Sequence, residues 1–456
     1  MILERIIQSK REEIAARKTL MPLDSFKNSL SASRRNLKAS LQKQTRPALI
    51  AEIKAKSPSA GELRHGFDFN QILDIYNRHP LVDAISVLTD TPFFGAKLDD
   101  LRQAADNSSK PILRKDFIID QYQIYESRLY GADAILLIAR LLSRSQITEF
   151  IHIAATLDMD CLLEIHHETE IPKIPQNVPI LGINNRNLDT LKIDLNQTIR
   201  LSQILQPRCE ILVAESGIHS RQDVHLIRPF ADAMLIGSSL LKSENINRKI
   251  EELFSPAIKI CGITNSSDAR QTAKFGADYL GFVFYPQSQR FILPGKAAEI
   301  MKNIRQDFPN CKMVGVFVNE TIAKIRTICD QCQLDYIQLH GDEPDNYIHN
   351  LDAPVIKAFR IRDQTDIRRV NQSIAQRVLL DSWSDSQYGG TGRRFDWQLL
   401  KNIEKPLVFL AGGITPKNFP EVKKLYSYAI DISSGIEKYP GKKDRTKLKQ
   451  LFTGAL

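Results

Sequence analysis

Short, nearly continuous apolar runs recur along this chain, and longer segments with the apolar spacing of amphipathic helices separate them. In the first half the runs are LIAEIK, AISVLT, PILRK, AILLIA, CLLEI, ILGIN, ILVAE and MLIG. In the second half they are IKIC, YLGFVF, MVGVFV, YIQLH, PVIKAF, RVLLD, LVFLAGG and AIDISS. Parallel strands that are buried on both faces have this appearance, and eight alternations of strand and helix are typical of a (β/α)8 barrel. The pattern therefore predicts an α/β protein with two tandem (β/α)8 TIM barrels.

The chain length agrees with this division, because 456 residues exceed what one hydrophobic core usually serves. We predict a first domain over residues 1–250, a linker at about 251–256 and a second domain over residues 257–456. The residues before the first strand, about 1–46, have helical apolar spacing at their start. We expect them to form an additional helical segment that packs on the first barrel.

The composition is that of a globular protein, with 43% hydrophobic and 25% charged residues. The formal net charge is +9, but the basic residues are spread along the chain, and the two densest runs, SRRNLK and GKKDRTKLK, look like solvated helix faces. We therefore expect small anionic substrates and no nucleic acid, while a non-catalytic basic binding protein remains the alternative. The first residues mix charges with apolar side chains. We expect neither a signal peptide nor a membrane span, and a cytoplasmic location.

The six cysteines are scattered, which is typical of a reducing compartment and not of a disulfide framework. Cys329 and Cys332 form a single CxxC, a spacing that also places two residues on one helix face. We expect His166 and His167 to be loop residues and not metal ligands. We expect no metal site.

One small-residue pattern occurs in both halves. VAESGI and LAGGIT end apolar runs, and each is followed about twenty residues later by a second run, MLIGSSL or AIDISSG. Barrel enzymes commonly bind phosphate between the loops after strands seven and eight, where glycine lets backbone N–H groups approach the ligand. The repeated pattern predicts one phosphate site in each barrel. The candidate ligands are Gly217, Gly237 and Ser238 in the first and Gly412, Gly413, Ser433, Ser434 and Gly435 in the second.

Charged and amide side chains end several apolar runs of the first half, namely Lys54, Lys115, Glu164, Asn184 and Glu215. Glu52 shares a strand face with Lys54, since side chains alternate along a strand. Strand ends of a barrel meet at one mouth, so these groups are expected to converge there. Their chemistry suits general acid and base catalysis on a carbonyl or hydroxyl. A purely structural salt-bridge network is the alternative.

Longer strings carry a resemblance to two known families. AEIKAKSPSAG, ILRKDFIID, LLEIH, GINNRNL, VAESGI and IGSSLL resemble the successive motifs of indole-3-glycerol-phosphate synthase. KICGITN, GFVFYPQSQR, VGVFVN, QLHGDE, LLDS, YGGTGRRFDW, AGGI, IDISSGIE and PGKKD resemble those of phosphoribosylanthranilate isomerase. The chain thus resembles the bifunctional fusion of two consecutive steps in tryptophan biosynthesis, with small phosphosugar-anthranilate substrates. A different pair of phosphosugar barrels, such as the histidine-pathway isomerase and cyclase, would carry an aspartate where this chain has Lys54 and Cys261.

In the second half, the isomerase resemblance implies that Asp381 is the general acid at the ring oxygen and that Cys261 is the general base at the adjacent sugar carbon. It also implies that Arg290 binds the anthranilate carboxylate. His340 and Asp431 match positions that line the same mouth.

In the first half, the synthase resemblance implies that Lys115 is the general acid at the ketone and that Glu164 is the base or electrostatic partner for the later proton loss. Lys54, paired with Glu52, would assist dehydration. Which lysine protonates which oxygen stays open. Further residues would position hydroxyls, carboxylate and phosphate, and these are Asn184, Arg186, Glu215, Ser216 and Ser57. Neither reaction implies a metal or another cofactor, and we expect a monomer.

Overall fold

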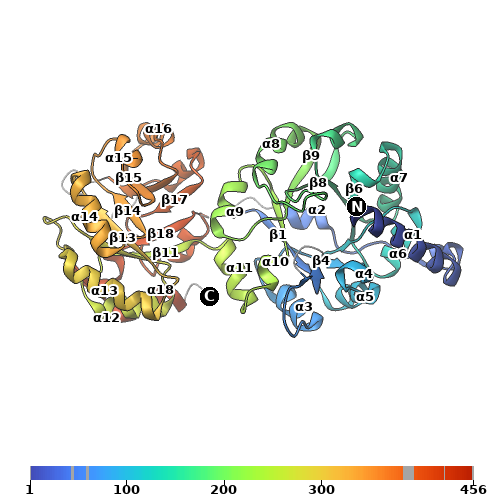
Figure 1. The fold of residues 1–456 in the computed structure, drawn as a ribbon, viewed down its shortest axis with the longest axis horizontal. Coiled ribbons are helices and arrows are strands. Elements are labelled where there is room, and N and C mark those ends of the chain that lie inside the picture. Colours follow the sequence, from blue (N-terminus) through green and yellow to red (C-terminus); the bar gives the residue numbers. More distant parts are fainter. Residues whose placement is uncertain (1, 43–45, 58–60, 384–394, 426, 454–456) are drawn as a thin grey trace. The chain divides into compact units, whose positions relative to one another are not determined.

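The computed structural model describes the chain except residues 1, 43–45, 58–60, 384–394, 426 and 454–456. The chain divides into two compact units, Met1–Phe254 and Ser255–Leu456. Each unit contains a closed barrel of eight parallel strands, with helices between consecutive strands (Figure 1). The prediction of two tandem (β/α)8 barrels is confirmed.

The strands of the first barrel coincide with the eight apolar runs. They are β1 (Ala48–Ile53), β4 (Ala84–Leu88), β5 (Ile112–Lys115), β6 (Ala134–Ile138), β7 (Asp160–Ile165), β8 (Val178–Asn184), β9 (Cys209–Glu215) and β10 (Ala233–Ile236). They pair in sequence order, and β10 closes the barrel on β1 with Ala48 opposite Ala233. Alternate residues face inward, so Ile50 packs in the interior while Leu49 and Ala51 pack against the helices.

Helices cover the outside of this barrel. They are α3 (Phe69–Arg78), α4 (Thr91–Phe94), α5 (Leu98–Asn107), α6 (Gln121–Leu129), α7 (Arg144–Ala155), α8 (Asn196–Leu205), α9 (Arg221–Ile227), α10 (Ser238–Leu241) and α11 (Ile246–Phe254). Several begin at a side-chain cap that the sequence provides. Asp68, for example, accepts hydrogen bonds from the backbone N–H groups of Asn70 and Gln71 at the start of α3. A short hairpin, β2 (Lys56–Ser57) with β3 (Gly61–Glu62), follows β1.

The N-terminal segment forms a long helix and a short one, α1 (Ile2–Leu20) and α2 (Leu37–Leu41), with two 3-10 turns between them. The α2 helix contributes Leu37 and Leu41, both fully buried, to the interior of the barrel. The α1 helix packs on α6 and is fixed by Lys10, which is fully buried. Its Nζ lies 3.0 Å from Asp90 Oδ2 and 2.9 Å from Asp116 Oδ1. Asp116 directly follows β5, so this helix is tied to the strand ends.

The second barrel repeats the arrangement. Its strands are β11 (Ala257–Cys261), β12 (Tyr279–Val283), β13 (Lys312–Phe317), β14 (Tyr336–Leu339), β15 (Val355–Ile361), β16 (Arg377–Ser382), β17 (Leu407–Leu410) and β18 (Ala429–Ile432). Its helices are α12 (Ser266–Phe275), α13 (Pro294–Asp307), α14 (Ile322–Cys332), α15 (Asn346–His349), α16 (Gln364–Gln372), α17 (Phe419–Lys423) and α18 (Arg445–Thr453). A hairpin of β19 (Glu437–Tyr439) and β20 (Lys442–Lys443) follows β18. Aromatic side chains fill part of the interior, where the ring of Phe409 lies against Tyr279 and Tyr428.

No helix among the described residues is long and apolar enough to cross a bilayer. Cys329 and Cys332 both lie on α14, as their spacing indicates. Within the described part of the chain, no group of three or more His, Cys, Asp and Glu side chains is arranged to hold a metal ion.

Candidate active sites

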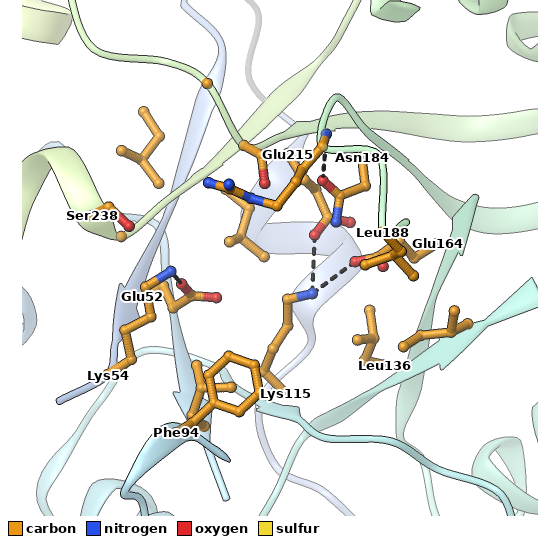
Figure 2. A pocket seen from close by; sticks show the side chains of 18 of the residues that line it. Glu52, Lys54, Phe94, Lys115, Leu136, Glu164, Asn184, Leu188, Glu215 and Ser238 are labelled. Atoms are coloured by element: carbon orange, nitrogen blue, oxygen red, sulfur yellow. Dashed lines mark hydrogen bonds and ion pairs between the residues drawn. The ribbon is translucent and has the colours of Figure 1, made fainter. Parts of the chain in front are cut away.

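A cavity opens at the C-terminal ends of the strands of the first barrel (Figure 2). Nearly all the residues that the sequence predicted for this mouth line the cavity. They are Glu52, Lys54, Lys115, Glu164, Asn184, Arg186, Glu215, Ser216, Gly217, Gly237 and Ser238. Ser57 lies in β2, and its side chain is outside the described part of the structure. The side chains that end β1, β5, β7, β8 and β9 thus converge on one space.

Lys115 lies at the centre of this group, where its ammonium reaches two carboxylates (Figure 2). Its Nζ is 2.7 Å from Glu164 Oε2 and 3.2 Å from Glu215 Oε2. Burial by itself lowers the pKa of Lys115, but the two carboxylates raise it by more, so its pKa lies above the ordinary lysine value. Lys115 therefore carries a proton at neutral pH, as a general acid must.

The two carboxylates around Lys115 are not equivalent. Burial raises the pKa of Glu164, but the Lys115 ammonium, His166 and the hydrogen bonds to the carboxylate together outweigh burial and hold that pKa well below its usual value. Burial and the nearby negative charge of Glu164 together raise the pKa of Glu215 well above the usual value. Two buried carboxylates that share one cation cannot both ionise easily. A proton is therefore held more readily by Glu215 than by Glu164, which stays ionised.

Further polar groups surround this centre. Across the cavity, Lys54 pairs with Glu52, with Nζ 2.5 Å from Oε1. The amide oxygen of Asn184 accepts a hydrogen bond from the backbone N–H of Arg186 at 3.0 Å. His166, expected as a loop residue, is buried directly after β7, with Nε2 3.0 Å from Glu164 Oε1.

The loop after β9 has an unusual backbone at the predicted phosphate site. Ser216 has φ of +64° and Gly217 has φ of +88°. A Cβ atom at Gly217 would lie 2.4 Å from Ile193 Cγ2, so both the conformation and the space require glycine there. Gly237 and Ser238 lie where β10 passes into α10. The seventh and eighth strands thus place two small-residue loops at one side of the cavity.

The apolar lining of the cavity escaped the sequence analysis. Phe94, Leu136 and Leu188 line the cavity among the charged groups, with Leu188 close to Glu164 (Figure 2). Leu3 and Ile6 of α1 also line the cavity, so the N-terminal helix contributes to the site as well as packing on the barrel. The helical spacing of these two residues was visible in the sequence, but it does not indicate which surface they contact.

The second barrel places Cys261 at the end of β11, 8% exposed. Lys259, two residues earlier on the same strand, is fully buried, and its Nζ lies 2.8 Å from Asp431 Oδ2 on β18. The Ser433 hydroxyl, directly after β18, donates a hydrogen bond to the backbone oxygen of Cys261 at 3.2 Å. Cys261, Asp431 and Ser433 therefore meet at one mouth, and Lys259 adds a cation that the sequence analysis missed.

Arg290 already binds a carboxylate in this structure. Its Nε and Nη2 atoms donate to Glu437 at 3.0 and 2.7 Å. Glu437 also pairs with Lys443, whose Nζ lies 2.9 Å from Oε1 and donates to the backbone oxygen of Cys261 at 2.5 Å. The expectation that GKKDRTKLK is a solvated helix face is wrong at this position. Lys443 lies in the β20 hairpin, 4% exposed, because buried partners satisfy its charge.

Asp381 ends β16, and His340 directly follows β14, with His340 Nε2 3.7 Å from Asp381 Oδ2. The other Asp381 oxygen accepts a hydrogen bond from the backbone N–H of Ser382 at 2.8 Å. Most of the YGGTGRRFDW string, which follows β16, lies outside the described residues. The predicted phosphate ligands of this barrel lie in the segments after β17 and β18, and these are Gly412, Gly413, Ser433, Ser434 and Gly435.

Comparison with known proteins assigns each barrel to a family. Residues 3–253 match indole-3-glycerol phosphate synthase, and residues 258–453 match N-(5'-phosphoribosyl)anthranilate isomerase. A tryptophan biosynthesis protein TrpCF from Buchnera aphidicola subsp. Diuraphis noxia is 38% identical over 99% of this chain and 98% of its own. The TrpCF protein of Vibrio cholerae is 35% identical over 99% of this chain and 95% of its own.

The chain belongs to the TrpCF family. The resemblance that the motifs indicated is thereby confirmed for both halves, and the histidine-pathway alternative is excluded. A solved phosphoribosyl anthranilate isomerase from Thermus thermophilus is similar to 43% of this chain and 96% of its own, with 35% identity and a TM-score of 0.40.

Proposed function

We propose that this TrpCF-family chain catalyses two consecutive steps of tryptophan biosynthesis. The second barrel isomerises N-(5'-phosphoribosyl)anthranilate to 1-(2-carboxyphenylamino)-1-deoxyribulose 5-phosphate, an Amadori rearrangement. The first barrel converts that product to indole-3-glycerol phosphate, with loss of carbon dioxide and water. The observation that carries this proposal is that two enzyme families match in tandem, each on a closed barrel with acid and base groups at its mouth.

In the isomerase barrel, Asp381 protonates the ring oxygen of the ribose as the ring opens. Cys261, as thiolate, then removes the proton from the adjacent sugar carbon, which gives the enol that becomes the ketone. Arg290 binds the anthranilate carboxylate. Its ion pair with Glu437 fixes the guanidinium at the mouth of the barrel, which supports this role.

In the synthase barrel, the aromatic carbon next to the amino group attacks the ketone, and Lys115 protonates the developing alkoxide. Carbon dioxide then leaves the same aromatic carbon. Loss of the hydroxyl as water completes the ring, with Glu164 accepting the final proton and Lys54 assisting departure of the hydroxyl. The 2.7 Å contact between Lys115 and Glu164 supports this division, because it keeps the acid charged and the base ionised.

Each barrel binds the phosphate of its ligand in the small-residue loops after its seventh and eighth strands. In the first barrel the positive φ angles at Ser216 and Gly217 turn the backbone beside the cavity, which supports a site built from backbone N–H groups. The apolar residues that line the same cavity, among them Phe94 and Leu188, suit the anthranilate ring. We further expect the chain to act as a monomer.

The test is a conversion assay with the purified chain. Phosphoribosylanthranilate should disappear, the aminodeoxyribulose phosphate should appear transiently, and indole-3-glycerol phosphate should accumulate. Supplying the aminodeoxyribulose phosphate directly tests the first barrel alone. A chain that leaves phosphoribosylanthranilate unchanged, or that stops at the intermediate, would contradict the proposal for the corresponding barrel.

A further inference from the structure

A buried ion pair lies inside the second barrel, next to the thiol of Cys261. Lys259 and Cys261 point to the same side of β11, into the barrel, because they are two residues apart. Lys259 is 0% exposed, and its ammonium lies 2.8 Å from Asp431 Oδ2. Lys259 and Asp431 are also register partners between β11 and β18. Burying two charges is costly, so a pair in this position calls for a reason beyond packing.

Apolar side chains also lie close to the thiol. Cys261 packs with Val283 and Val316, and Tyr285 lies against this group. A Cβ atom at Gly281 on the neighbouring strand would lie 2.7 Å from the sulfur, so the absence of a side chain there makes room for it. Burial of this kind raises the pKa of the Cys261 thiol. An apolar pocket alone would therefore keep the sulfur protonated, and a protonated thiol cannot act as a base.

We propose that Lys259 is a positioning residue that favours the thiolate form of Cys261, and that Asp431 in turn fixes the ammonium of Lys259. This proposal deepens the proposed isomerase function and rests on Cys261 being its base. Lys259 keeps its own proton throughout. The thiolate takes the proton from the sugar carbon and returns it when the product forms, while the ammonium stabilises the negative charge of the sulfur.

The electrostatic effects around the sulfur agree with this geometry. Burial keeps the pKa of Cys261 above its ordinary value, and Lys259 offsets part of that rise, whereas the Asp431 carboxylate adds to it. Of these two partners, the Lys259 ammonium has the larger effect on the pKa of Cys261. Burial lowers the pKa of Lys259 itself, but Asp431 and Cys261 together outweigh burial, so the pKa lies above the ordinary lysine value and Lys259 remains charged.

Two further cations lie near Cys261 from other elements, Lys443 on β20 and Arg290 in the segment after β12. Both bind the same carboxylate, Glu437, on β19. Lys443 also donates to the backbone oxygen of Cys261 and not to its sulfur. The negative charge of Glu437 therefore offsets the charges of Lys443 and Arg290. Lys259 differs from them because it lies inside the barrel, on the same strand face as the thiol.

The decisive variant is Lys259→Met, which removes the charge and keeps a long side chain. Alkylation of Cys261 by iodoacetamide is followed from about pH 6 to 10 by mass spectrometry of its peptide, which separates it from the other cysteines. Removal of a cation destabilises the thiolate, so the midpoint should move up by about 1 to 3 pH units. The acidic limb of the pH profile of kcat/KM for isomerisation should move in the same direction. Lys312→Met, at an exposed lysine that begins β13, is the matched control and should shift neither.

A second variant gives the opposite sign and keeps the proposal testable if the second barrel of Lys259→Met does not fold, as judged by tryptophan fluorescence and circular dichroism. Asp431→Asn removes the anion, so the alkylation midpoint should move down. An unchanged or lower midpoint in folded Lys259→Met, or an unchanged or higher one in Asp431→Asn, would overturn the proposal. Isomerisation that persists in Cys261→Ala would instead refute the role of Cys261 as base, a separate failure.

Discussion

At the scale of single residues, the synthase site depends on how one ammonium is shared between two carboxylates. Lys115 contacts both Glu164 and Glu215, and the carboxylates differ in the direction in which their pKa values move. Pairs of titratable groups whose pKa values are driven apart are typical of acid and base assignments. A similar effect is proposed in the second barrel, where the Lys259 ammonium favours the thiolate form of the buried Cys261 thiol.

Replacement of each carboxylate by its amide should therefore have unequal effects on ring closure. Glutamine resembles a protonated glutamate, so Glu215→Gln should cost about tenfold or less in kcat, whereas Glu164→Gln removes the base and should cost about 100-fold or more. Steady-state kinetics with the aminodeoxyribulose phosphate measures both. The isomerase activity of the same proteins serves as the control and should be unchanged.

The pH dependence supplies a second measurement on these two variants. Because the pKa of Glu215 is raised, its protonated form is present below that pKa and is lost as the pH rises through it. Wild-type ring closure should therefore lose activity on the alkaline side, and this limb should weaken in Glu215→Gln. A larger loss in Glu215→Gln than in Glu164→Gln would show that the two roles are reversed.

The sequence predicted part of these sites and missed the rest for identifiable reasons. Lys115 and Glu164 were predictable because charged residues that end buried strands of a barrel must meet at its mouth. Lys259 was missed because it lies inside an apolar run, where a lysine gives no sign of the anion that it pairs with on another strand. Lys443 was missed because a run of basic residues looks solvated in the sequence. The sequence does not indicate that Glu437 is the buried carboxylate that pairs with Lys443.

At the scale of elements, the sixteen barrel strands follow directly from the apolar runs, because parallel strands buried on both faces leave no polar alternation. The α2 helix was not predictable in this way. It has five residues, Leu37–Leu41, which are too few to show a helical period, and its role depends on the barrel interior that it closes. Local pattern therefore predicts the repeated elements, whereas an irregular element depends on long-range packing.

The α2 helix should contribute strongly to the stability of the first barrel. Leu37→Ala removes a fully buried side chain from the interior and should lower the free energy of unfolding by about 2 to 5 kcal/mol. Urea denaturation followed by ring-closure activity measures this change. Both tryptophans, Trp383 and Trp397, lie in the second barrel, so their fluorescence reports the unfolding of that barrel alone and should not shift.

Leu20→Ala is the matched control, because Leu20 lies in the same N-terminal segment and is 85% exposed. It should change the unfolding free energy by no more than about 0.5 kcal/mol. Equal effects of the two leucine substitutions would show that α2 does not pack into the barrel as described.

At the scale of the whole molecule, each family match falls on its own compact unit with its own closed barrel. The candidate residues of the two reactions are divided in the same way. Cys261 and Asp381 belong to the second unit, and Lys115 and Glu164 belong to the first. Barrel interiors are packed with side chains and their sites open at loop ends, so release of the intermediate into solvent is the expected route.

The central claim, two independent sites that act in sequence, is tested most directly by mixing two inactive proteins. Cys261→Ala should lose isomerisation and keep ring closure, and Lys115→Ala should do the reverse, each loss being about 100-fold or more. Neither protein alone should convert phosphoribosylanthranilate to indole-3-glycerol phosphate. The mixture should restore that conversion after a lag in which the aminodeoxyribulose phosphate accumulates. A mixture of two folded variants that stays inactive would contradict the account, because the two sites would then have to act within one chain.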